Sequence, residues 1–317
     1  MDAIIGNRGF VGGHLVNQHD FAAQYNTSNI DQALGHSFSK VVCAAAPGSM
    51  FEANKFPDRD KKNVDQLIDQ LSQITAKQFV LVSSIAVLED FAGKDDEFTD
   101  RFQTELAYGR HRRELEVFCS ENFSSCLILR LPALFGHKLK KNFIFDLLNP
   151  VPSMLNKKSY DELVKILPSI LAKLLVKVYL WNDEINMYQV DRSILKNSEN
   201  KDELEEALAK TDYSSVQFTN PNTTFQYYNI ENLWSDIEMA QNNNIKLLHL
   251  ATEPLAAERI HMELTGKTMP DTQARIHHEN MYSSYGKLWK GSGPYLADGN
   301  SILTQLKTFF ENEKKFS

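Results

Sequence analysis

The chain has 317 residues, of which 42% are hydrophobic and 24% charged, with a formal net charge of -7. These proportions are ordinary for a soluble globular protein, and the length is sufficient for an α/β domain with a second lobe. The acidic balance provides no basic surface of the kind that binds nucleic acid, which excludes that class of partner from our expectations.

A glycine-rich turn stands near the start of the chain. Gly6, Gly9 and Gly12 follow the apolar run 3–5, and a helical pattern begins at His14. Gly6 can take backbone angles that a side chain forbids, Gly9 lets the backbone approach a phosphate, and Gly12 lets the helix lie close to the strand. The N–H groups of the first helical turn would then face an anion. The order predicts a dinucleotide-binding turn; a glycine-rich turn without a ligand is the alternative.

Apolar strands alternate with helical patterns as far as Gly136. The expected strands are 3–5, 21–25, 40–46, 78–84 and 126–131, and helices are expected after His14, over 58–74 and over 104–118. Continuous apolar strands suit a parallel sheet that is covered on both faces. The sequence therefore predicts a Rossmann-type, doubly wound α/β fold, with ligands bound at the carboxyl ends of the strands.

After Gly136 the strand–helix alternation stops and helical patterns dominate. Helices are expected over 143–148, 161–178, 201–210 and 302–310, and a further strand over 245–250. We expect a dinucleotide-binding domain over 1–137, completed by about 225–250. Residues 138–317 are expected to form a smaller, mostly helical substrate-binding lobe with the C-terminal helices.

The segment 163–181 is the most apolar long stretch, but it contains Lys165, Lys173, Lys177 and Pro168. We expect an amphipathic helix of the second lobe here, and docking on a membrane surface is the alternative. No apolar run is long enough to span a bilayer, so we expect no membrane-spanning segment, and we expect no signal peptide before the first strand.

The three cysteines, Cys43, Cys119 and Cys126, lack the spacing of a metal site. Buried thiols in a reducing cytosol are therefore expected, and we predict a cytoplasmic protein. The run His277-His278-Glu279 has no convincing set of partner ligands, so no metal is predicted.

Three residues near the predicted sheet edge suggest acid–base chemistry. Ser84 ends the fourth strand, while Tyr108 and Arg112 lie one turn apart on one helix face. The cation would lower the pKa of the phenol, and the phenolate would take a proton from a substrate hydroxyl as hydride leaves the carbon. Ser84 would hydrogen-bond the same oxygen. Taken singly, a strand-end serine and a surface helical pair are the alternatives.

Together these motifs resemble the extended short-chain dehydrogenases/reductases, the NAD(P)-dependent epimerase/dehydratase superfamily, over most of the chain. The matching segments are Gly6-x-x-Gly9-Phe10-x-Gly12, Ala44-Ala45-Ala46, Asn63-Val64, Ser83-Ser84, Tyr108-x-x-x-Arg112, Arg130 to Gly136 and Tyr227 to Leu233. The combination is specific for the superfamily but does not identify the member.

The resemblance implies roles for particular residues. Ser84 would donate a hydrogen bond to the substrate oxygen, Tyr108 would be the general acid/base, and Arg112 would hold the nicotinamide ribose. The implied cofactor-binding residues are Gly6, Asn7, Arg8, Gly9, Phe10, Val11, Gly12, Asn26, Ser28, Ala44, Ala45, Ala46, Asn63, Val82, Tyr108, Arg112 and Pro132. The implied substrate contacts are Ser84, Asn142 and Phe143, although Asn142 could equally cap the helix that begins at Phe143.

The resemblance also implies an activity. It indicates reduction or epimerisation at a carbon of a nucleotide-activated sugar, bound between the sheet and the second lobe, in the synthesis of surface polysaccharide. The implied assembly is a homodimer formed through helices 58–74 and 104–118.

Four departures from the family pattern bear on this activity. Arg112 replaces the usual lysine; a guanidinium keeps the charge but does not release a proton. Ile85-Ala86 stand where dehydratases carry Asp-Glu, and Ile85 stands where double epimerases carry cysteine. Phe225 replaces an arginine that grips the diphosphate of a nucleotide sugar. Either another cation does that work, the candidates being Lys140, Lys141 and Arg259, or the substrate is not a nucleotide sugar.

Arg112 and Phe225 also motivate a hypothesis from another class. The chain could be a dinucleotide-binding protein with weak or no catalysis, acting as a sensor or an assembly partner.

Cofactor choice depends on the end of the second strand, Tyr25 to Asn29, which has no acidic residue to bind the ribose of NAD. Because Arg8 also lies in the glycine turn, we favour NADP(H) over NAD(H), which stays possible.

Overall fold

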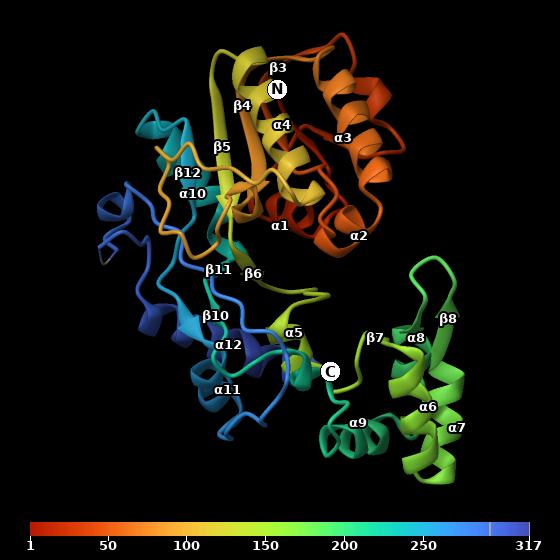
Figure 1. Cartoon of the computed structure of the whole chain (residues 1–317). Coiled ribbons are helices and arrows are strands. Elements are labelled where there is room, and N and C mark those ends of the chain that lie inside the picture. The colour runs from red at the N-terminus through yellow and green to blue at the C-terminus, as the bar shows by residue number, and fades with distance from the viewer. Residues whose placement is uncertain (292, 317) are drawn as a thin grey trace. The chain divides into compact units, whose positions relative to one another are not determined.

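The computed structural model describes residues 1–291 and 293–316, and the chain divides into two compact units (Figure 1). The first unit consists of residues 1–139, 224–255 and 278–309, and the second of 140–223, 256–277 and the described residues from 310 onward. Each unit has a hydrophobic core of its own.

A six-stranded parallel sheet forms the centre of the first unit. In spatial order its strands are β12 (Leu247–His249), β5 (Cys126–Leu131), β4 (Thr75–Ser84), β3 (Ser37–Cys43), β1 (Asp2–Ile5) and β2 (Ala23–Tyr25). All five pairings are parallel, which confirms the predicted doubly wound α/β fold. The chain moves from β1 to β2 on one side and returns to β3 on the other. The strand order therefore reverses between β1 and β3, the place where such sheets bind ligands.

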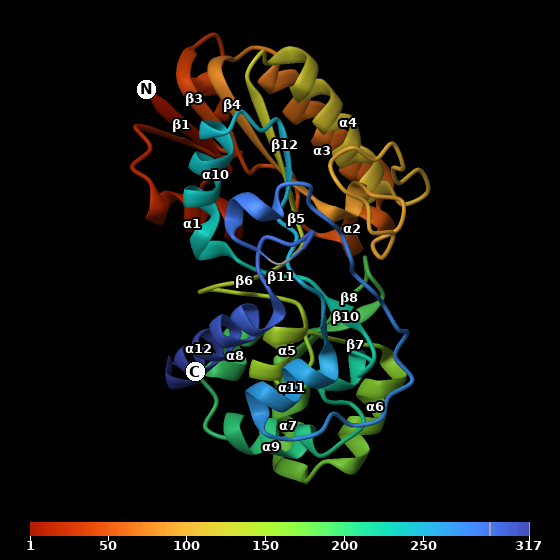
Figure 2. The same ribbon diagram turned by 90° about the vertical axis from the view of Figure 1, so that its left-hand side faces the viewer.

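Helices cover both faces of this sheet (Figure 2). They are α1 (Phe10–Gln18) and α10 (Leu233–Asn242) on one face and α3 (Pro57–Leu71) and α4 (Ala107–Asn122) on the other, with α2 (Met50–Lys55) packed against α3 and α4. Helix α12 (Gly299–Phe316) does not cover this sheet, and its Phe309 ring contacts that of Phe135. Ile4 and Val80 point to the face covered by α1 and α10, and Ile5 and Phe79 to the face covered by α3 and α4. Neighbouring residues of a strand face opposite ways, so a continuous apolar run fills both cores.

The strand expected over 245–250 is present as β12, which pairs with β5 at the sheet edge. Two short pairs accompany the main sheet: β6 (Ala133–Phe135) with β11 (Tyr227–Asn229), and β10 (Thr224–Phe225) with β13 (Leu255–Ala256). Residues 278–309, which the sequence assigned to the second lobe, group with the first unit. There the Asn280 N–H donates to the Phe91 carbonyl over 2.6 Å, a contact between distant segments that leaves no local signal in the sequence.

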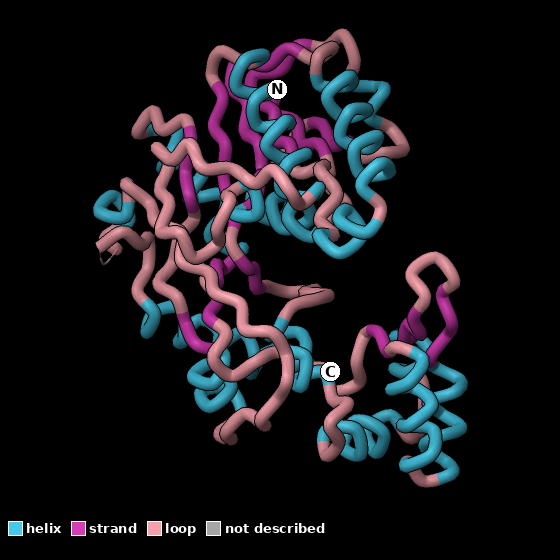
Figure 3. Tube along the Cα trace, viewed as in Figure 1, coloured by secondary structure: helices cyan, strands magenta, loops and turns pink. Residues whose placement is uncertain are grey.

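The second unit is mostly helical (Figure 3). Its helices are α5 (Phe143–Leu148), α6 (Lys157–Ile166), α7 (Ser169–Val178), α8 (Arg192–Lys196), α9 (Lys201–Ala209) and α11 (Ala257–Thr265). The sequence did not predict its three-stranded antiparallel sheet, in which β9 (Met187–Val190) lies between β7 (Met154–Leu155) and β8 (Tyr179–Asn182).

The single helix predicted over 163–181 is wrong. Helix α6 ends at Ile166, α7 begins at Ser169, and the chain continues as a strand from Tyr179. Pro168 causes the break, because proline lacks an N–H and disfavours helical angles in the residue before it. The apolar stripe of α7, which includes Leu171 and Leu175, is buried in the second unit. Among the described residues, no helix has both the length and the apolar character needed to cross a bilayer.

Asp146 of α5 makes the second unit sensitive to pH. Burial raises the pKa of its carboxyl to about 7, and the Arg192 guanidinium offsets only part of this effect. Below the pKa of the unfolded chain, the Asp146 carboxyl is protonated in both states and costs no stability. As pH rises toward 7, the unfolded chain loses this proton while the folded protein keeps it, so the free energy of unfolding falls. We expect Asp146→Asn to increase the unfolding free energy by about 4 kcal/mol near pH 8, and hardly at all near pH 4. Urea unfolding at the two pH values measures this, and equal effects at both would contradict it.

Candidate cofactor and catalytic site

The glycine turn is packed so closely that two of its residues have no room for a side chain. Gly6 has a φ of +95°, and a Cβ there would lie 2.5 Å from the Ala44 carbonyl oxygen. A Cβ on Gly12 would lie 2.1 Å from the Gly6 carbonyl oxygen. Helix α1 begins directly after Gly9, with no side-chain cap and no acidic residue in its first turn, where Phe10 and Val11 lie. Its first N–H groups are therefore suited to an anion, and the residues present fit a dinucleotide phosphate.

Three predicted cofactor residues form a cluster where β1 and β2 end. The Asn26 side chain donates to Asn7 Oδ1 over 3.2 Å, and the Ser28 hydroxyl donates to Asn26 Oδ1 over 2.6 Å. Asn7 also donates to Gln24 Oε1 over 3.3 Å. Arg8 lies beside them and is exposed. Asn7, Asn26 and Ser28 are uncharged, and Arg8 is the positively charged residue that follows Asn7 in the chain.

The structure places the remaining predicted cofactor residues along the same sheet edge. Strand β3 ends at Cys43, earlier than expected, so Ala44, Ala45 and Ala46 follow the strand and Ala44 contacts Gly6. Val82 lies half-buried within β4, and Pro132 is buried between β5 and β6.

Ser84, Tyr108 and Arg112 come together from two elements of the first unit. Tyr108 is the second residue of α4, and its N–H donates to Asn54 Oδ1 of α2 over 2.9 Å. Arg112 follows one turn later, with its guanidinium carbon 4.1 Å from the centre of the Tyr108 ring. The Ser84 hydroxyl, at the end of β4, hydrogen-bonds the phenol and accepts from the Ala86 N–H over 3.2 Å. The structure therefore brings together the three residues that the sequence singled out, and their catalytic roles stay predictions.

The predicted lowering of the Tyr108 pKa by Arg112 is present, but a larger and opposite effect, that of burial, was not predicted. Burial raises the pKa of Tyr108 above its ordinary value, because the phenolate would lose its hydration. The Arg112 charge and the Ser84 hydrogen bond lower the pKa, as expected, but they do not outweigh burial. The phenol is therefore neutral across the physiological pH range.

Asp60 of α3 is the site residue that the sequence analysis missed. Its carboxylate accepts hydrogen bonds from Arg112 Nη1 and, over 2.9 Å, from Nη2, while His111 Nδ1 lies 2.8 Å from its Oδ2. Burial alone would raise the pKa of Asp60, but these hydrogen bonds hold it below its usual value. A signal was present: Asp60 lies on the buried stripe of α3 with Val64 and Leu67, a place where an acid needs a partner.

The remaining predicted residues are Asn63, Asn142 and Phe143. Asn63 is exposed on α3, almost one turn after Asp60, and its cofactor contact stays a prediction. Asn142 belongs to the second unit, where its Oδ1 accepts from the N–H groups of Ile144 and Phe145. It therefore caps α5, which is the alternative that the sequence allowed. Phe143 is buried in the same unit.

A buried ion pair supports the ends of β4 and β5. Glu116 of α4 accepts from Arg130 Nε over 3.0 Å and from Arg130 Nη2 over 2.7 Å. The same carboxylate accepts from the Ser83 hydroxyl over 2.6 Å, and Arg130 also lies 3.1 Å from His249 Nε2 of β12. Burial lowers the pKa of His249, so its imidazole is neutral. The network connects α4 to the neighbouring strands β4, β5 and β12, and it includes Ser83, the residue before Ser84.

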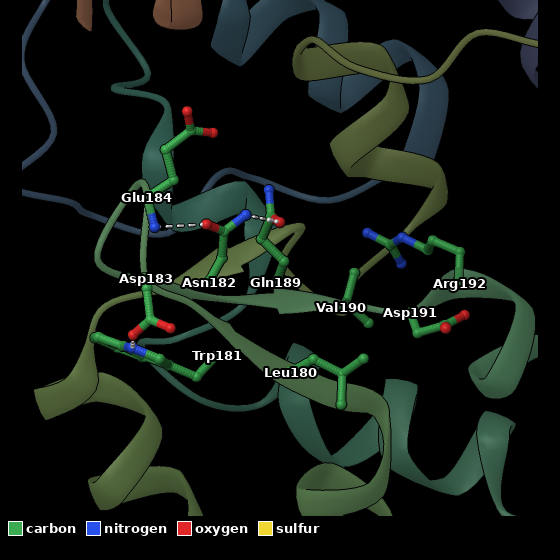
Figure 4. Close-up of a pocket in the computed structure, with 9 residues that line it drawn as sticks. All are labelled: Leu180, Trp181, Asn182, Asp183, Glu184, Gln189, Val190, Asp191 and Arg192. Carbon is green, nitrogen blue, oxygen red and sulfur yellow. Dashed lines mark hydrogen bonds between the residues drawn. The ribbon is translucent and has the colours of Figure 1, made fainter.

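The second unit has a hollow of about 760 Å³ on the β8–β9 hairpin (Figure 4). Its lining residues are Leu180, Trp181, Asn182, Asp183, Glu184, Gln189, Val190, Asp191 and Arg192. A single hairpin forms it, and Asn182 and Gln189 hydrogen-bond each other across the two strands over 2.8 Å. None of the predicted catalytic or cofactor residues is among the nine. No cluster of metal-ligand side chains occurs in the part of the chain that is described.

No protein-family model matches the chain, and no curated protein matches it. Solved structures do match over nearly the whole length. RMD of Pseudomonas aeruginosa, solved with NADPH, has a TM-score of 0.63 at 11% identity and covers 100% of this chain and 99% of its own. The dTDP-4-dehydrorhamnose reductase of Bacillus anthracis, solved with NADP, has a TM-score of 0.60 at 14% identity, with 98% and 97% covered.

A third match is the UDP-N-acetylglucosamine 4-epimerase of Methanobrevibacter ruminantium, solved with UDP-N-acetylmuramic acid. Its TM-score is 0.61 at 12% identity, with 100% of this chain and 98% of that chain covered. The chain has the same fold as these reductases and this epimerase. At these identities the likeness establishes the fold, and the chemistry has to be argued from the residues of this chain.

Proposed function

We propose that this protein belongs to the extended short-chain dehydrogenase/reductase family and reduces a carbonyl group on a sugar, using NADPH. The observation that carries the proposal is the group of Ser84, Tyr108 and Arg112 at the carboxyl end of the sheet. Residues 44–47 connect this group to the glycine turn, since Ala44 contacts Gly6 and the Pro47 carbonyl accepts from Arg112. One bound ligand could therefore contact both places.

The glycine turn and the Asn7–Asn26–Ser28 cluster would hold the dinucleotide, with its phosphates at the N-terminus of α1. When bound, the reduced nicotinamide supplies a hydride to the carbonyl carbon. Tyr108 supplies the proton to the carbonyl oxygen, and Ser84 donates a hydrogen bond to the same oxygen. The phenolate that remains is stabilised by Arg112 and regains its proton from water.

The raised pKa of Tyr108 favours the reducing direction. A general acid must carry its proton when substrate arrives, and a neutral phenol does so at physiological pH. The opposite reaction requires the phenolate as a base, which burial disfavours. Epimerisation needs both directions in turn, so reduction is the better match to this site.

The substrate proposal is a nucleotide-activated keto sugar, and it is supported by the solved structures of similar fold. Lys140, Lys141 and Arg259 of the second unit are exposed and stay candidates for the diphosphate. Purified protein incubated with NADPH and a set of keto-sugar nucleotides tests this proposal. Oxidation of NADPH with one of them supports it, and no oxidation with any member of the set counts against this substrate class.

Cofactor choice can be tested at Arg8, which is exposed beside the neutral Asn7–Asn26–Ser28 cluster. We expect Arg8→Ala to weaken NADPH binding about 10-fold or more, the value of one charge-assisted hydrogen bond, and to leave NADH binding nearly unchanged. Calorimetric titration of both cofactors into both proteins measures this. An equal loss for the two cofactors would refute contact between Arg8 and the 2′-phosphate.

A second candidate function is dinucleotide binding with little or no catalysis, in a sensor or assembly role. The observation that favours it is the tight pairing of Arg112 with Asp60, which leaves the cation less free than a lysine would be. The two functions differ at Tyr108: only the reductase requires the phenol hydroxyl.

The homodimer and the cytoplasmic location also remain parts of the proposal. The outward side of α3 carries Asp58, Lys61, Lys62, Asp65 and Asp69 around a shallow hollow. A dimer through α3 and α4 would therefore depend on charged contacts, and we expect it to weaken as salt concentration rises. Sedimentation at low and high salt checks this, and a salt-independent dimer would point to another surface.

A further inference from the structure

The guanidinium of Arg112 is committed to fixed partners on two of its three nitrogens. Nη1 donates to Asp60 Oδ2 and to the Tyr108 carbonyl, while Nη2 donates to Asp60 Oδ1 and to the Pro47 carbonyl. The side chains of Arg112 and Asp60 are only 3% and 4% exposed. Two parallel hydrogen bonds between a guanidinium and a carboxylate fix orientation as well as distance.

The third nitrogen differs from the other two. Arg112 Nε is buried and has no hydrogen-bond partner within the described residues. A buried N–H without an acceptor destabilises the fold, so such groups usually have a role. Because the guanidinium lies against the Tyr108 ring, this donor is held next to the phenol.

We infer that Asp60 is a positioning residue: it fixes the guanidinium of Arg112 against the Tyr108 ring, and it offsets the Arg112 charge. This inference rests on the proposed function. It explains how an arginine can stand where the family resemblance expects a lysine. The planar fork serves Asp60, Pro47 and the phenol ring at once, which a single ammonium group cannot do.

The charge arrangement around Tyr108 supports this role. The groups that act on the phenol are Arg112 of α4, Asp60 of α3 and Ser84 of β4. Arg112 and Ser84 lower the pKa of Tyr108, and Asp60 raises it. His111, which contacts Asp60, is the remaining titratable neighbour of the pair. Loss of the Asp60 charge should therefore make the phenol easier to ionise.

The test is a titration of Tyr108, which needs neither cofactor nor substrate. Tyrosinate absorbance is followed with rising pH in each protein and in the same protein with Tyr108→Phe, and the difference is the Tyr108 curve. We expect Asp60→Asn to move this curve to lower pH by about one unit. Asp95→Asn is the matched control, because Asp95 is also a buried carboxylate paired with an arginine, Arg101, but it does not act on Tyr108. A folded Asp60→Asn protein with an unshifted curve would overturn the inference.

A second variant covers the case in which Asp60→Asn does not fold. Asp60→Asn/Arg112→Gln removes both charges and keeps two polar groups of similar shape, a change that buried ion pairs often tolerate. Since Arg112 lowers the pKa of Tyr108 more strongly than Asp60 raises it, the Tyr108 curve should move to higher pH in this protein. An unchanged curve would again overturn the inference.

Rescue provides a readout that a purely structural role would not move. Arg112→Lys alone should lower the rate of reduction, because Asp60 captures the ammonium group away from the phenol. Asp60→Asn/Arg112→Lys should recover part of that loss, whereas two independent structural defects would add. Shifted Tyr108 curves without any NADPH binding would refute the proposed function alone. NADPH-dependent reduction with unshifted curves would refute the inference alone.

Discussion

Tyr108→Phe is expected to lower the rate of carbonyl reduction by about 10²–10⁴-fold, the usual contribution of a positioned general acid. The substitution removes only the hydroxyl, so the ring that packs against Arg112 and the Asn54 contact to the backbone N–H are kept. NADPH affinity should therefore change little. Steady-state rates with a reducible sugar nucleotide, together with calorimetric titration of NADPH, measure the two quantities separately.

Tyr228→Phe is a suitable control, because Tyr228 is also a buried tyrosine of the first unit and donates to Asp236 over 2.5 Å, outside the site. Folded Tyr228→Phe protein should reduce the substrate at the wild-type rate. If Tyr108→Phe retained the wild-type rate, the reductase proposal would fail and the non-catalytic alternative would gain.

The reducing rate of the wild type should also stay level across neutral pH and fall only above the raised pKa of Tyr108.

Gly12→Ala is expected to abolish measurable NADPH binding. The new Cβ would lie 2.1 Å from the Gly6 carbonyl oxygen and 3.1 Å from the Asn7 Cα. Both are backbone atoms of the turn, which would have to move away from α1. Forced overpacking of this kind also destabilises a fold by about 1–3 kcal/mol, so the unfolding midpoint should fall as well.

Gly13→Ala is the matched control. It lies on the same helix, but the nearest atom to its Cβ would be the Asn7 carbonyl oxygen at an ordinary 3.8 Å. Alanine is also the better helix former, so this protein should be as stable as the wild type or more so, and it should bind NADPH. Equal loss of binding in both variants would mean that the close approach at Gly12 is not what shapes the turn.

The sequence predicted the central sheet well because that information is local. Continuous apolar runs identified the strands. The glycine spacing identified the turn, in which Gly6 has a positive φ. Tyr108 and Arg112 could be paired because four residues make one helical turn. Strand β12 was found as a strand from its own apolar residues, and its place beside β5 is confirmed by the pairing of Leu248 with Leu129.

The features that the sequence did not reveal depend on contacts between distant segments. Asp60 and Arg112 are 52 positions apart, and although the place of Asp60 on the buried stripe of α3 indicates that it needs a partner, nothing local identifies Arg112 as that partner. The effect of burial on the pKa of Tyr108 was not predicted, for a related reason. The attraction of a neighbouring cation can be read from spacing, whereas the degree of burial is a property of the whole fold. The break at Pro168 was readable from the chain, but the apolar residues on both sides favoured one longer helix.

Calorimetric titration of NADPH and NADH into the purified protein tests the central claim most directly. The account predicts exchangeable binding of one cofactor per chain, with NADPH preferred and that preference lost in Arg8→Ala. A cofactor carried tightly through purification would instead favour an epimerase, which reduces and reoxidises the same molecule. Absence of binding to either cofactor, in protein shown to be folded, would contradict the account, because the glycine turn would then have no ligand.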